Sequence, residues 1–548
     1  MASSLRLFLT IVVTLLLLPP TIASSPPHVI YILLDDLGFS DLGYTTTSTS
    51  IPTPSTPTID SLQSSPHTRT LKNYYIEPVC SPSRSSIQTG LYPLHHGVVN
   101  WLKPEDPNGL PLNLTTMAEH MNELGYVSRA VGKWHMGFYR DEYTPTFRGY
   151  SSFTGFYGGG EDYFTHVEGD GYDFRSDTKP HCGTFNSCSK VLTNNSALNR
   201  YSTEVFGEAA VNIINNHADE DPDKPLFLYL AFQGVHSGGG TTPQKYLDLN
   251  KNLTNPRLNF AGMLTAVDSA IKNVTESLKD NGLFDNTIIV FSTDNGGPVD
   301  GGDAVGSTNW PLRGGKHTIW EGGIRGVGFV TGGEDTVLNN SNNNDGDGDY
   351  NHLMNGVDWL PTIVGFGGGS AENIEGIDGV SHYEALINSP SSTTPRDSFY
   401  IGHYDANNDD SFVGGRGVRW DDVENDRRWK MIEQIKEGKN VPSWYSSENC
   451  AQSDDATSTK PCCGPKNGCE ETNPSGTFLF DVLADPSESQ DLSNQFPDIV
   501  TKLRAMADDF EEGQIEEGPP LEVECGDAVM GMDDVANATW QPWCSLLS

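Results

Sequence analysis

Basic residues are scarce in this sequence. Its 548 residues include 34 Lys and Arg but 73 Asp and Glu, which gives a formal net charge of −39. Because nucleic acid is bound through a positively charged face, this composition argues against a nucleic-acid partner. It also argues against long-range attraction of a polyanion, so any anion site must be built from a few local cations.

Long hydrophobic runs are also scarce. One apolar run covers residues 5–18, starts beside Arg6 and is followed by Pro19-Pro20. At about 1.5 Å of rise per helical residue, it is too short to cross a bilayer. Its charged start and the small residues that follow it are typical of a secretory signal peptide, which we predict over residues 1–24. A membrane anchor is the alternative, and no other stretch is long and apolar enough to span a membrane.

Cysteine is infrequent, and its count of nine is odd. If Cys80 stands apart, eight cysteines remain for up to four disulfides in an oxidising compartment. We predict that Cys182 and Cys188 close a small loop, while the pairing of the later cysteines stays open. Six Asn-x-Ser/Thr sequons favour a glycosylated product of the secretory pathway, extracellular or lysosomal/vacuolar. The sequons begin at Asn113, Asn194, Asn252, Asn273, Asn339 and Asn537.

Cys80 opens the most informative run of the chain, Cys80-Ser81-Pro82-Ser83-Arg84, which continues to Thr89-Gly90. Pro82 suits the first turn of a helix, where its missing N–H costs nothing. Cys80 would then lie at the positive end of that helix, where free N–H groups stabilise a thiol or a bound anion. Arg84, one turn further, adds a rigid positive group suited to a tetrahedral oxyanion. The alternative for Cys80 alone is a disulfide cysteine in a secreted loop.

Four apolar runs of β-forming residues are each followed at once by polar residues. Apolar strands that alternate with helical stretches, here expected over 115–124, 200–216 and 259–280, imply a parallel sheet covered on both faces. Ligands bind at the carboxyl ends of such strands, so we expect these polar residues to share one site. The runs are 28–34 before Asp35-Asp36, 126–131 before Lys133 and His135, 226–232 before His236, and 287–292 before Asp294-Asn295.

Two of these strand ends carry oxygen donors. Asp35, Asp36, Asp294 and Asn295 suit calcium or magnesium and suit zinc poorly. Taken singly, the first pair is compatible with a solvated loop and the second with a turn. Together, the two pairs predict a metal site.

The Cys80 run resembles the signature of the type I, formylglycine-dependent sulfatases. Further segments resemble later signatures of that family, and the arylsulfatase B group is the most similar. The resemblance covers most of residues 28–380 and implies an α/β fold of the alkaline phosphatase/sulfatase type. Its segments include Gly132-Lys133-Trp134-His135, Asp294-Asn295-Gly296-Gly297 and Trp310-Pro311-Leu312-Arg313-Gly314-Gly315-Lys316.

The resemblance implies a mechanism and a role for each site residue. A formylglycine-generating enzyme would oxidise Cys80, and one hydroxyl of the hydrated aldehyde would attack sulfur and expel the alcohol. The second hydroxyl would then lose its proton and eject sulfate. The implied roles are calcium binding by Asp35, Asp36, Asp294, Asn295 and an oxygen of the modified Cys80, nucleophile positioning by Arg84, sulfate contacts by Lys133, His236 and Lys316, and proton transfer by His135.

Short β-type runs appear from about residue 396, at 398–402, 417–420, 428–432 and 477–481. They predict a smaller C-terminal antiparallel sheet packed on the larger domain. We therefore divide the chain into a signal peptide at 1–24, a catalytic α/β domain at 25–395 and a C-terminal α+β subdomain at 396–548.

The substrate is less well determined. Arylsulfatase B has disulfide cysteines near its substrate rim, where this chain carries residues 101–106 without cysteine. We therefore expect a sulfated carbohydrate or an aryl sulfate, with N-acetylgalactosamine 4-sulfate as one candidate. One alternative is a phosphoesterase of the alkaline phosphatase superfamily, although the Ser or Thr nucleophile and His-rich dizinc site are not found. The other is a glycan-binding protein that keeps Cys80 unmodified.

Overall fold

Four strands that lie side by side form the middle of the central sheet. Strand β1 pairs in parallel with β10 and with β11, and β10 pairs in parallel with β4. Each strand matches one of the four predicted apolar runs to within two residues. The polar residues that follow the runs therefore lie at one edge of the sheet, as expected. The strands are β1 (His28–Leu34), β4 (Val127–Lys133), β10 (Leu226–Ala231) and β11 (Thr287–Thr293).

The whole sheet has ten strands among the residues that the computed structural model describes. Their order is β13-β2-β12-β11-β1-β10-β4-β5-β8-β9, with antiparallel pairs towards both edges. The outer strands are β2 (Arg69–Leu71), β5 (Ser152–Phe156), β8 (Arg175–Thr178), β9 (Ser189–Val191), β12 (Gly328–Gly332) and β13 (Asp349–Tyr350). The described residues are 25–46, 51–178, 189–192, 197–236, 242–298, 306–339, 348–388, 394–402, 415–434, 476–513, 539–540, 542 and 544.

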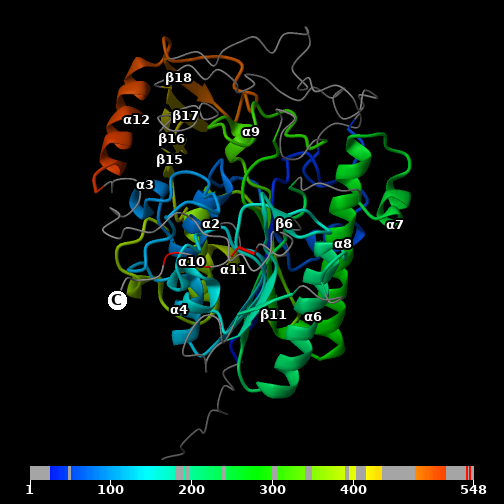
Figure 1. The fold of residues 1–548 in the computed structure, drawn as a ribbon. Coiled ribbons are helices and arrows are strands. Elements are labelled where there is room, and N and C mark those ends of the chain that lie inside the picture. The colour runs from blue at the N-terminus through cyan, green and yellow to red at the C-terminus, as the bar shows by residue number, and fades with distance from the viewer. Residues whose placement is uncertain are drawn as a thin grey trace, which may run out of the picture.

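Helices cover both faces of the sheet (Figure 1). On β1, Ile30 and Ile32 pack into the cluster that contains helices α6 and α8, whereas Tyr31 and Leu33 pack into the cluster that contains α2, α4 and α10. This alternation follows from the two-residue period of a strand. The three predicted helices are confirmed as α4, α6 and α8. The covering helices are α2 (Cys80–Thr89), α4 (Met117–Glu123), α6 (Ser202–Glu220), α8 (Arg257–Asp280) and α10 (Trp359–Phe366).

Shorter elements connect these layers. Strands β3 and β14 form one small sheet, and β6 and β7 form another. The strands are β3 (Tyr74–Tyr75), β6 (Val167–Glu168), β7 (Gly171–Tyr172) and β14 (Met354–Asn355). The helices are α1 (Pro57–Gln63), α3 (Pro93–His96), α7 (Gln244–Leu247), α9 (Glu321–Ile324) and α11 (Tyr383–Ile387).

The predicted C-terminal antiparallel sheet is present. Its four strands follow the order β15-β16-β17-β18, every neighbouring pair is antiparallel, and helix α12 lies beside it at the top of Figure 1. The domain boundary near residue 396 stays a prediction. The elements are β15 (Ser398–Ile401), β16 (Gly415–Asp422), β17 (Arg427–Gln434), β18 (Gly476–Asp481) and α12 (Pro497–Phe510).

Some predictions concern residues that the structure does not describe. The signal peptide at 1–24 and the pair Cys182 and Cys188 lie outside the described residues. Cys544 is disulfide-bonded, and Cys80 is free and buried. Among the described residues, we find no helix whose length and apolar character would let it cross a membrane.

A buried ionic cluster joins the C-terminal sheet to helix α9, which belongs to the larger part of the molecule. On β17, Lys430 Nζ lies 3.1 Å from Glu321 Oε1 and 2.8 Å from Glu488 Oε1, and all three side chains are fully buried. The backbone N–H of Glu321 donates to Glu488 Oε2 at 2.7 Å. Burial and the neighbouring Glu321 carboxylate raise the pKa of Glu488 to about 7, although Lys430 opposes the shift. Lys430 thus compensates two carboxylates from separate segments.

Removing this cation is expected to destabilise the protein. In Lys430→Met, two buried carboxylates lose their shared partner, and breaking a buried ion pair in this way costs about 3–5 kcal/mol. Urea denaturation should show that loss in the free energy of unfolding. The exposed Lys251 provides the control, since Lys251→Met should change stability by less than about 0.5 kcal/mol. Equal stability of both variants would contradict the role of Lys430.

Candidate active site

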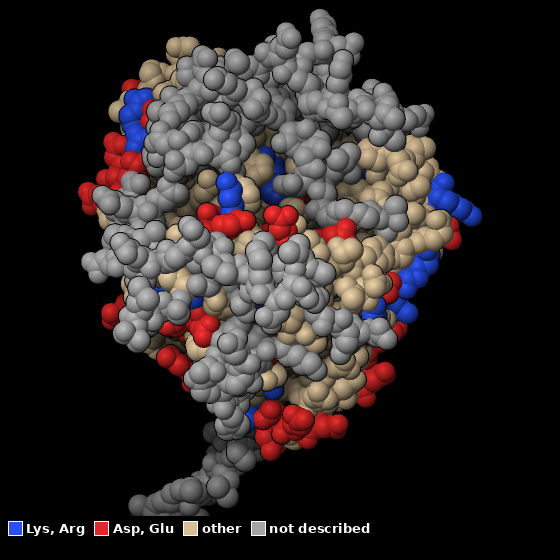
Figure 2. Space-filling view, viewed as in Figure 1, with Lys and Arg blue, Asp and Glu red and all other residues tan. Residues whose placement is uncertain are grey.

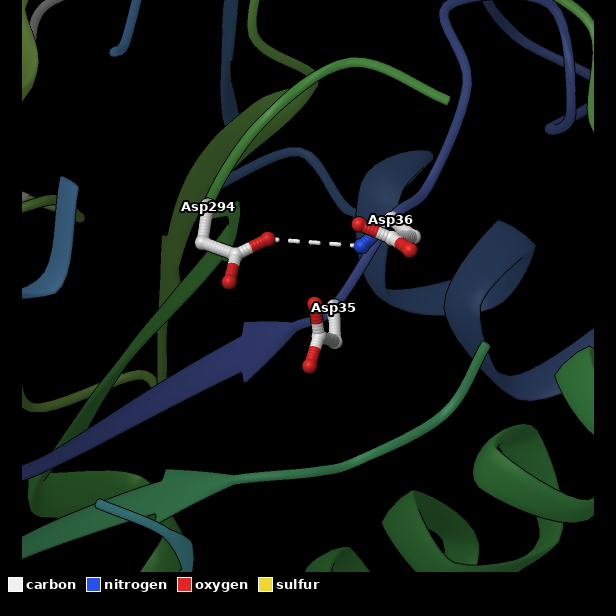
Figure 3. A group of neighbouring side chains, drawn as sticks. All are labelled: Asp35, Asp36 and Asp294. Carbon is white, nitrogen blue, oxygen red and sulfur yellow. Dashed lines mark hydrogen bonds between the residues drawn. The ribbon is translucent and has the colours of Figure 1, made fainter. Parts of the chain in front are cut away.

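Three carboxylates meet where β1 and β11 end. Leu34 and Thr293 are in register at the ends of the two strands, so Asp35 and Asp294 follow them side by side. Figure 3 shows Asp35, Asp36 and Asp294 around one small space. One oxygen from each lies within 4.8 Å of the others, and all three side chains are buried. The predicted acidic cluster is therefore formed by the fold.

Hydrogen bonds fix the geometry of this acidic cluster. Asp36 has a φ of 62°, a left-handed conformation that Asp tolerates better than most residues. Its backbone N–H donates to Asp294 Oδ1 at 3.3 Å, the contact drawn in Figure 3. The Asn295 side-chain amide donates to Asp36 Oδ1 at 2.7 Å. The fourth predicted ligand, Asn295, thus lies against the acidic cluster.

Two buried oxygens of this group make no hydrogen bond: Asp35 Oδ1 and Asn295 Oδ1. A buried acceptor without a partner costs about 1–3 kcal/mol, so such atoms call for a ligand. Burial and the neighbouring Asp35 carboxylate raise the pKa of Asp294 to about 6, which reflects repulsion between the acids. A hard divalent cation would satisfy the free oxygens and reduce this repulsion. The donor set therefore fits calcium.

Three cations surround the acids. Lys133 Nζ donates to Asp35 Oδ2 at 2.6 Å, and Lys316 Nζ lies 2.9 Å from Asp36 Oδ1. Arg84 donates to Asp294 Oδ2 from Nε at 3.0 Å and from a terminal nitrogen at 2.7 Å. The side chains of Arg84 and Lys133 are fully buried, and that of Lys316 is nearly so. Three carboxylates and three basic groups, all with buried side chains, thus balance one another.

Cys80 is the first residue of α2, as its sequence context predicts. The helix end favours a thiolate, but burial dominates and raises the pKa of the thiol, although Lys133 and Lys316 oppose the shift. The thiol therefore stays protonated near neutral pH. Because the thiolate is the nucleophilic form, unmodified Cys80 is a weak nucleophile here.

His135 has one ring nitrogen free for chemistry. Its Nε2 lies 3.0 Å from the carbonyl oxygen of Leu102, and its buried Nδ1 has no hydrogen-bond partner. A carbonyl only accepts hydrogen bonds, so Nε2 carries the proton. Burial, followed by the charges of Lys133 and Arg84, holds the pKa of His135 well below its usual range. The neutral ring therefore offers the Nδ1 lone pair as a base.

The remaining predicted residue, His236, also reaches the acidic cluster. Its Nε2 lies 3.9 Å from Asp36 Oδ2, and 14% of its side chain is exposed, so it lies nearer to solvent than the lysines. The structure thus brings together every site residue that the sequence singled out. Sequence reasoning missed the carbonyl of Leu102 and the loop Gly158–Gly160, which packs against both histidines. The three consecutive glycines are the signal that could have indicated a close backbone approach.

The surface differs from this interior. On the face in Figure 2, red acidic groups are spread over the described surface, while blue groups are fewer and lie near its left and right edges and near its centre. An anion site in so acidic a protein depends on local cations, which here are Arg84, Lys133 and Lys316.

Known proteins are similar to this chain in sequence and in fold. The chain is 33% identical to arylsulfatase J of Mus musculus over 535 residues, which covers 95% of this chain and 81% of that protein. It is 26% identical to arylsulfatase A of Homo sapiens over 498 residues, covering 88% and 87% respectively. The crystal structure of Ps i-CgsB superposes with a TM-score of 0.68 at 25% identity and covers 90% of this chain and 94% of that one.

The match to a protein family covers most of the part of the chain that forms the central sheet and its helices. The model of the Sulfatase family matches residues 27–369, which include every predicted site residue. That span is more than half of the chain, and the arylsulfatase relatives agree with it. The protein therefore belongs to the sulfatase family, the sulfuric ester hydrolases.

Proposed function

We propose that this sulfatase removes sulfate monoesters from sulfated sugars or glycans, with a formylglycine formed from Cys80 and a bound calcium ion. The observation that carries the proposal is the meeting of Cys80, three carboxylates and three cations in one buried cluster. Carbohydrate substrates are favoured by two similar proteins. One is human N-acetylgalactosamine-6-sulfatase. The other is Ps i-CgsB, which was also crystallised in complex with k-i-k-neocarrahexaose.

Asp35, Asp36, Asp294 and Asn295 would hold the calcium ion. When bound, the ion would add positive charge beside the sulfate oxygens and polarise them. Without it, the three carboxylates and three basic groups cancel. With it, the site would attract a sulfate monoester anion although the protein as a whole is strongly acidic.

Oxidised and hydrated, residue 80 would supply the hydroxyl that attacks sulfur. Arg84 lies one helical turn from it, and its guanidinium is fixed by Asp294, so it would orient the nucleophile. His135 Nδ1 would take the hydroxyl proton, because Nε2 is engaged with Leu102. A second hydroxyl on the same carbon would let sulfate leave as the aldehyde returns.

Lys133, Lys316 and His236 would bind the sulfate group. The two lysines act electrostatically on Cys80, so both lie near the attacking atom. The more exposed His236 would meet the substrate first. Groups held in place by carboxylates need little reorganisation when charge develops in the transition state.

The exposed sequons of the molecule fit maturation in the secretory pathway. We propose that a signal peptide at 1–24 directs the chain there, that a formylglycine-generating enzyme modifies Cys80, and that the product is extracellular or lysosomal/vacuolar. Sequons at four described positions support this, because their asparagines are all exposed. They are Asn113, Asn252, Asn273 and Asn339.

The state of Cys80 tests the proposed nucleophile. We expect mass spectrometry of the peptide that contains Cys80 to show an aldehyde, and Cys80→Ala to abolish hydrolysis of 4-nitrophenyl sulfate. The Cys80→Ala protein should keep its circular dichroism spectrum, since one small side chain is shortened. An unmodified thiol in fully active enzyme would refute the proposal. Hydrolysis of 4-nitrophenyl phosphate without that of the sulfate would favour the phosphoesterase alternative.

Calcium binding can be tested without an activity assay. Calcium at about 100 times its dissociation constant should stabilise the folded protein by about 2.7 kcal/mol, seen as a higher melting temperature than in a chelator. Asp35→Asn should lose most of that shift, because it weakens a ligand. Asp280→Asn, at an exposed position, should keep the shift. A calcium shift that is the same in both variants would place the ion elsewhere.

Lys316 is predicted to stabilise the transition state. Lys316→Ala should lower kcat for 4-nitrophenyl sulfate by about 10²–10³-fold, a loss comparable with removal of one oxyanion-stabilising group. Circular dichroism should confirm that folding is retained. Lys279→Ala, at an exposed site on α8, is the control and should keep full turnover. An unchanged kcat in Lys316→Ala would contradict the assigned role.

A further inference from the structure

Two carboxylates outside the acidic cluster capture four consecutive backbone N–H groups. Tyr157 and Gly158 donate to Asp173 Oδ2 at 3.0 and 2.8 Å. Gly159 and Gly160 donate to Glu168 Oε1 at 2.8 and 3.2 Å. Each acid thus accepts two N–H groups through one oxygen, and this pair of acids fixes the backbone of the loop.

The captured loop lies against both site histidines. A Cβ atom built on Gly159 would lie 2.8 Å from His135 Nε2, and one built on Gly160 would lie 3.0 Å from His236 Cε1. The His135 backbone N–H also donates to the carbonyl of Tyr157 at 3.0 Å. The loop backbone thus forms a wall for the two imidazole rings, and a side chain there would displace one of them.

The carboxylates themselves are held by the β6–β7 hairpin and by Trp540. Glu168 ends β6, and its carbonyl accepts a hydrogen bond from Trp540 Nε1 at 2.9 Å. Trp540 also packs so tightly on Gly171 that an added Cβ would lie 2.7 Å from its ring nitrogen. Trp540, which is distant in the sequence, therefore helps to fix the position of Glu168 and of the loop that Glu168 binds.

Each carboxylate keeps one buried oxygen, Glu168 Oε2 or Asp173 Oδ1, without a hydrogen-bond partner. Burial and the neighbouring Asp173 raise the pKa of Glu168 to about 8, while the N–H groups of Gly159 and Gly160 oppose the shift. Burial likewise raises the pKa of Asp173, opposed by Arg175. Burying two acids with unpartnered oxygens costs stability, which indicates that these acids serve the site and not only packing.

We propose that Glu168, with Asp173, is a positioning residue: it clamps the Gly158–Gly160 loop so that His135 and His236 hold their places beside the sulfate ester. The inference rests on the proposed function, since it takes the roles of the two histidines from there. The new element is the explanation of how His135 and His236 are held in alignment. Neither carboxylate needs to touch the substrate.

Glu168→Leu and Glu168→Gln separate this role from simple packing. Leucine cannot accept the two N–H groups, whereas the glutamine carbonyl can. We expect Glu168→Leu to lower kcat for 4-nitrophenyl sulfate by about tenfold or more, measured well below its melting temperature and per folded molecule, because misaligned groups lose rate. Glu168→Gln should restore most of kcat. Asp170→Ala, at an exposed position on the same hairpin, should equal the wild type.

Amide hydrogen exchange of the peptide that contains residues 157–160 provides a second readout that needs no activity. The clamp predicts slow exchange in the wild type and in Glu168→Gln, and fast exchange in Glu168→Leu. Wild-type kcat in Glu168→Leu, equal losses in the leucine and glutamine variants, or unchanged exchange would each overturn the clamp. An inactive wild type would refute the proposed function instead, and exchange would still decide whether the clamp exists.

Discussion

The site depends on opposite charges that are buried together at the ends of two strands. Asp35, Asp36 and Asp294 would repel one another in a dry interior, and Lys133, Lys316 and Arg84 make their burial possible. An isolated buried charge is expensive, so no member can be removed without leaving another uncompensated. This mutual dependence makes the cluster rigid, and rigid charges are what a reaction that moves negative charge requires.

The balance inside the cluster also explains how so acidic a protein can bind an anion. A net charge of −39 repels sulfate at long range. Within the site, however, the protein charges cancel, so a divalent ion would make the local field positive. The protein therefore relies on short-range contacts, which salt screens less than interactions across its surface.

The fold supplies the precision that this chemistry needs. The middle strands of the central sheet are buried between two helical layers, and site residues extend from their carboxyl ends. The loop Gly158–Gly160 brings a second kind of support, because backbone rather than side chains lies beside the histidines. Lys430 ties the C-terminal sheet to α9, close in sequence to Lys316. Contacts between distant segments thus support both the site histidines and the C-terminal sheet.

The sequence alone determined the middle of the sheet, since runs such as 28–34 and 287–292 are continuously apolar and end at polar residues. It also indicated the helix that begins at Cys80, because Pro82 suits a first turn, and the structure adds that the helix ends at Gly90. Local pattern suffices for such features: each depends on neighbours in the chain.

Only the tertiary structure decided which atoms are free to react. The sequence placed Cys80 at a helix end that favours a thiolate, whereas burial raises its pKa and keeps the thiol protonated. The contact of His135 Nε2 with Leu102, which leaves Nδ1 free, and the capture of Gly159 by Glu168 likewise follow from packing. Burial and hydrogen bonding are properties of atoms brought together across the chain, so no local pattern encodes them.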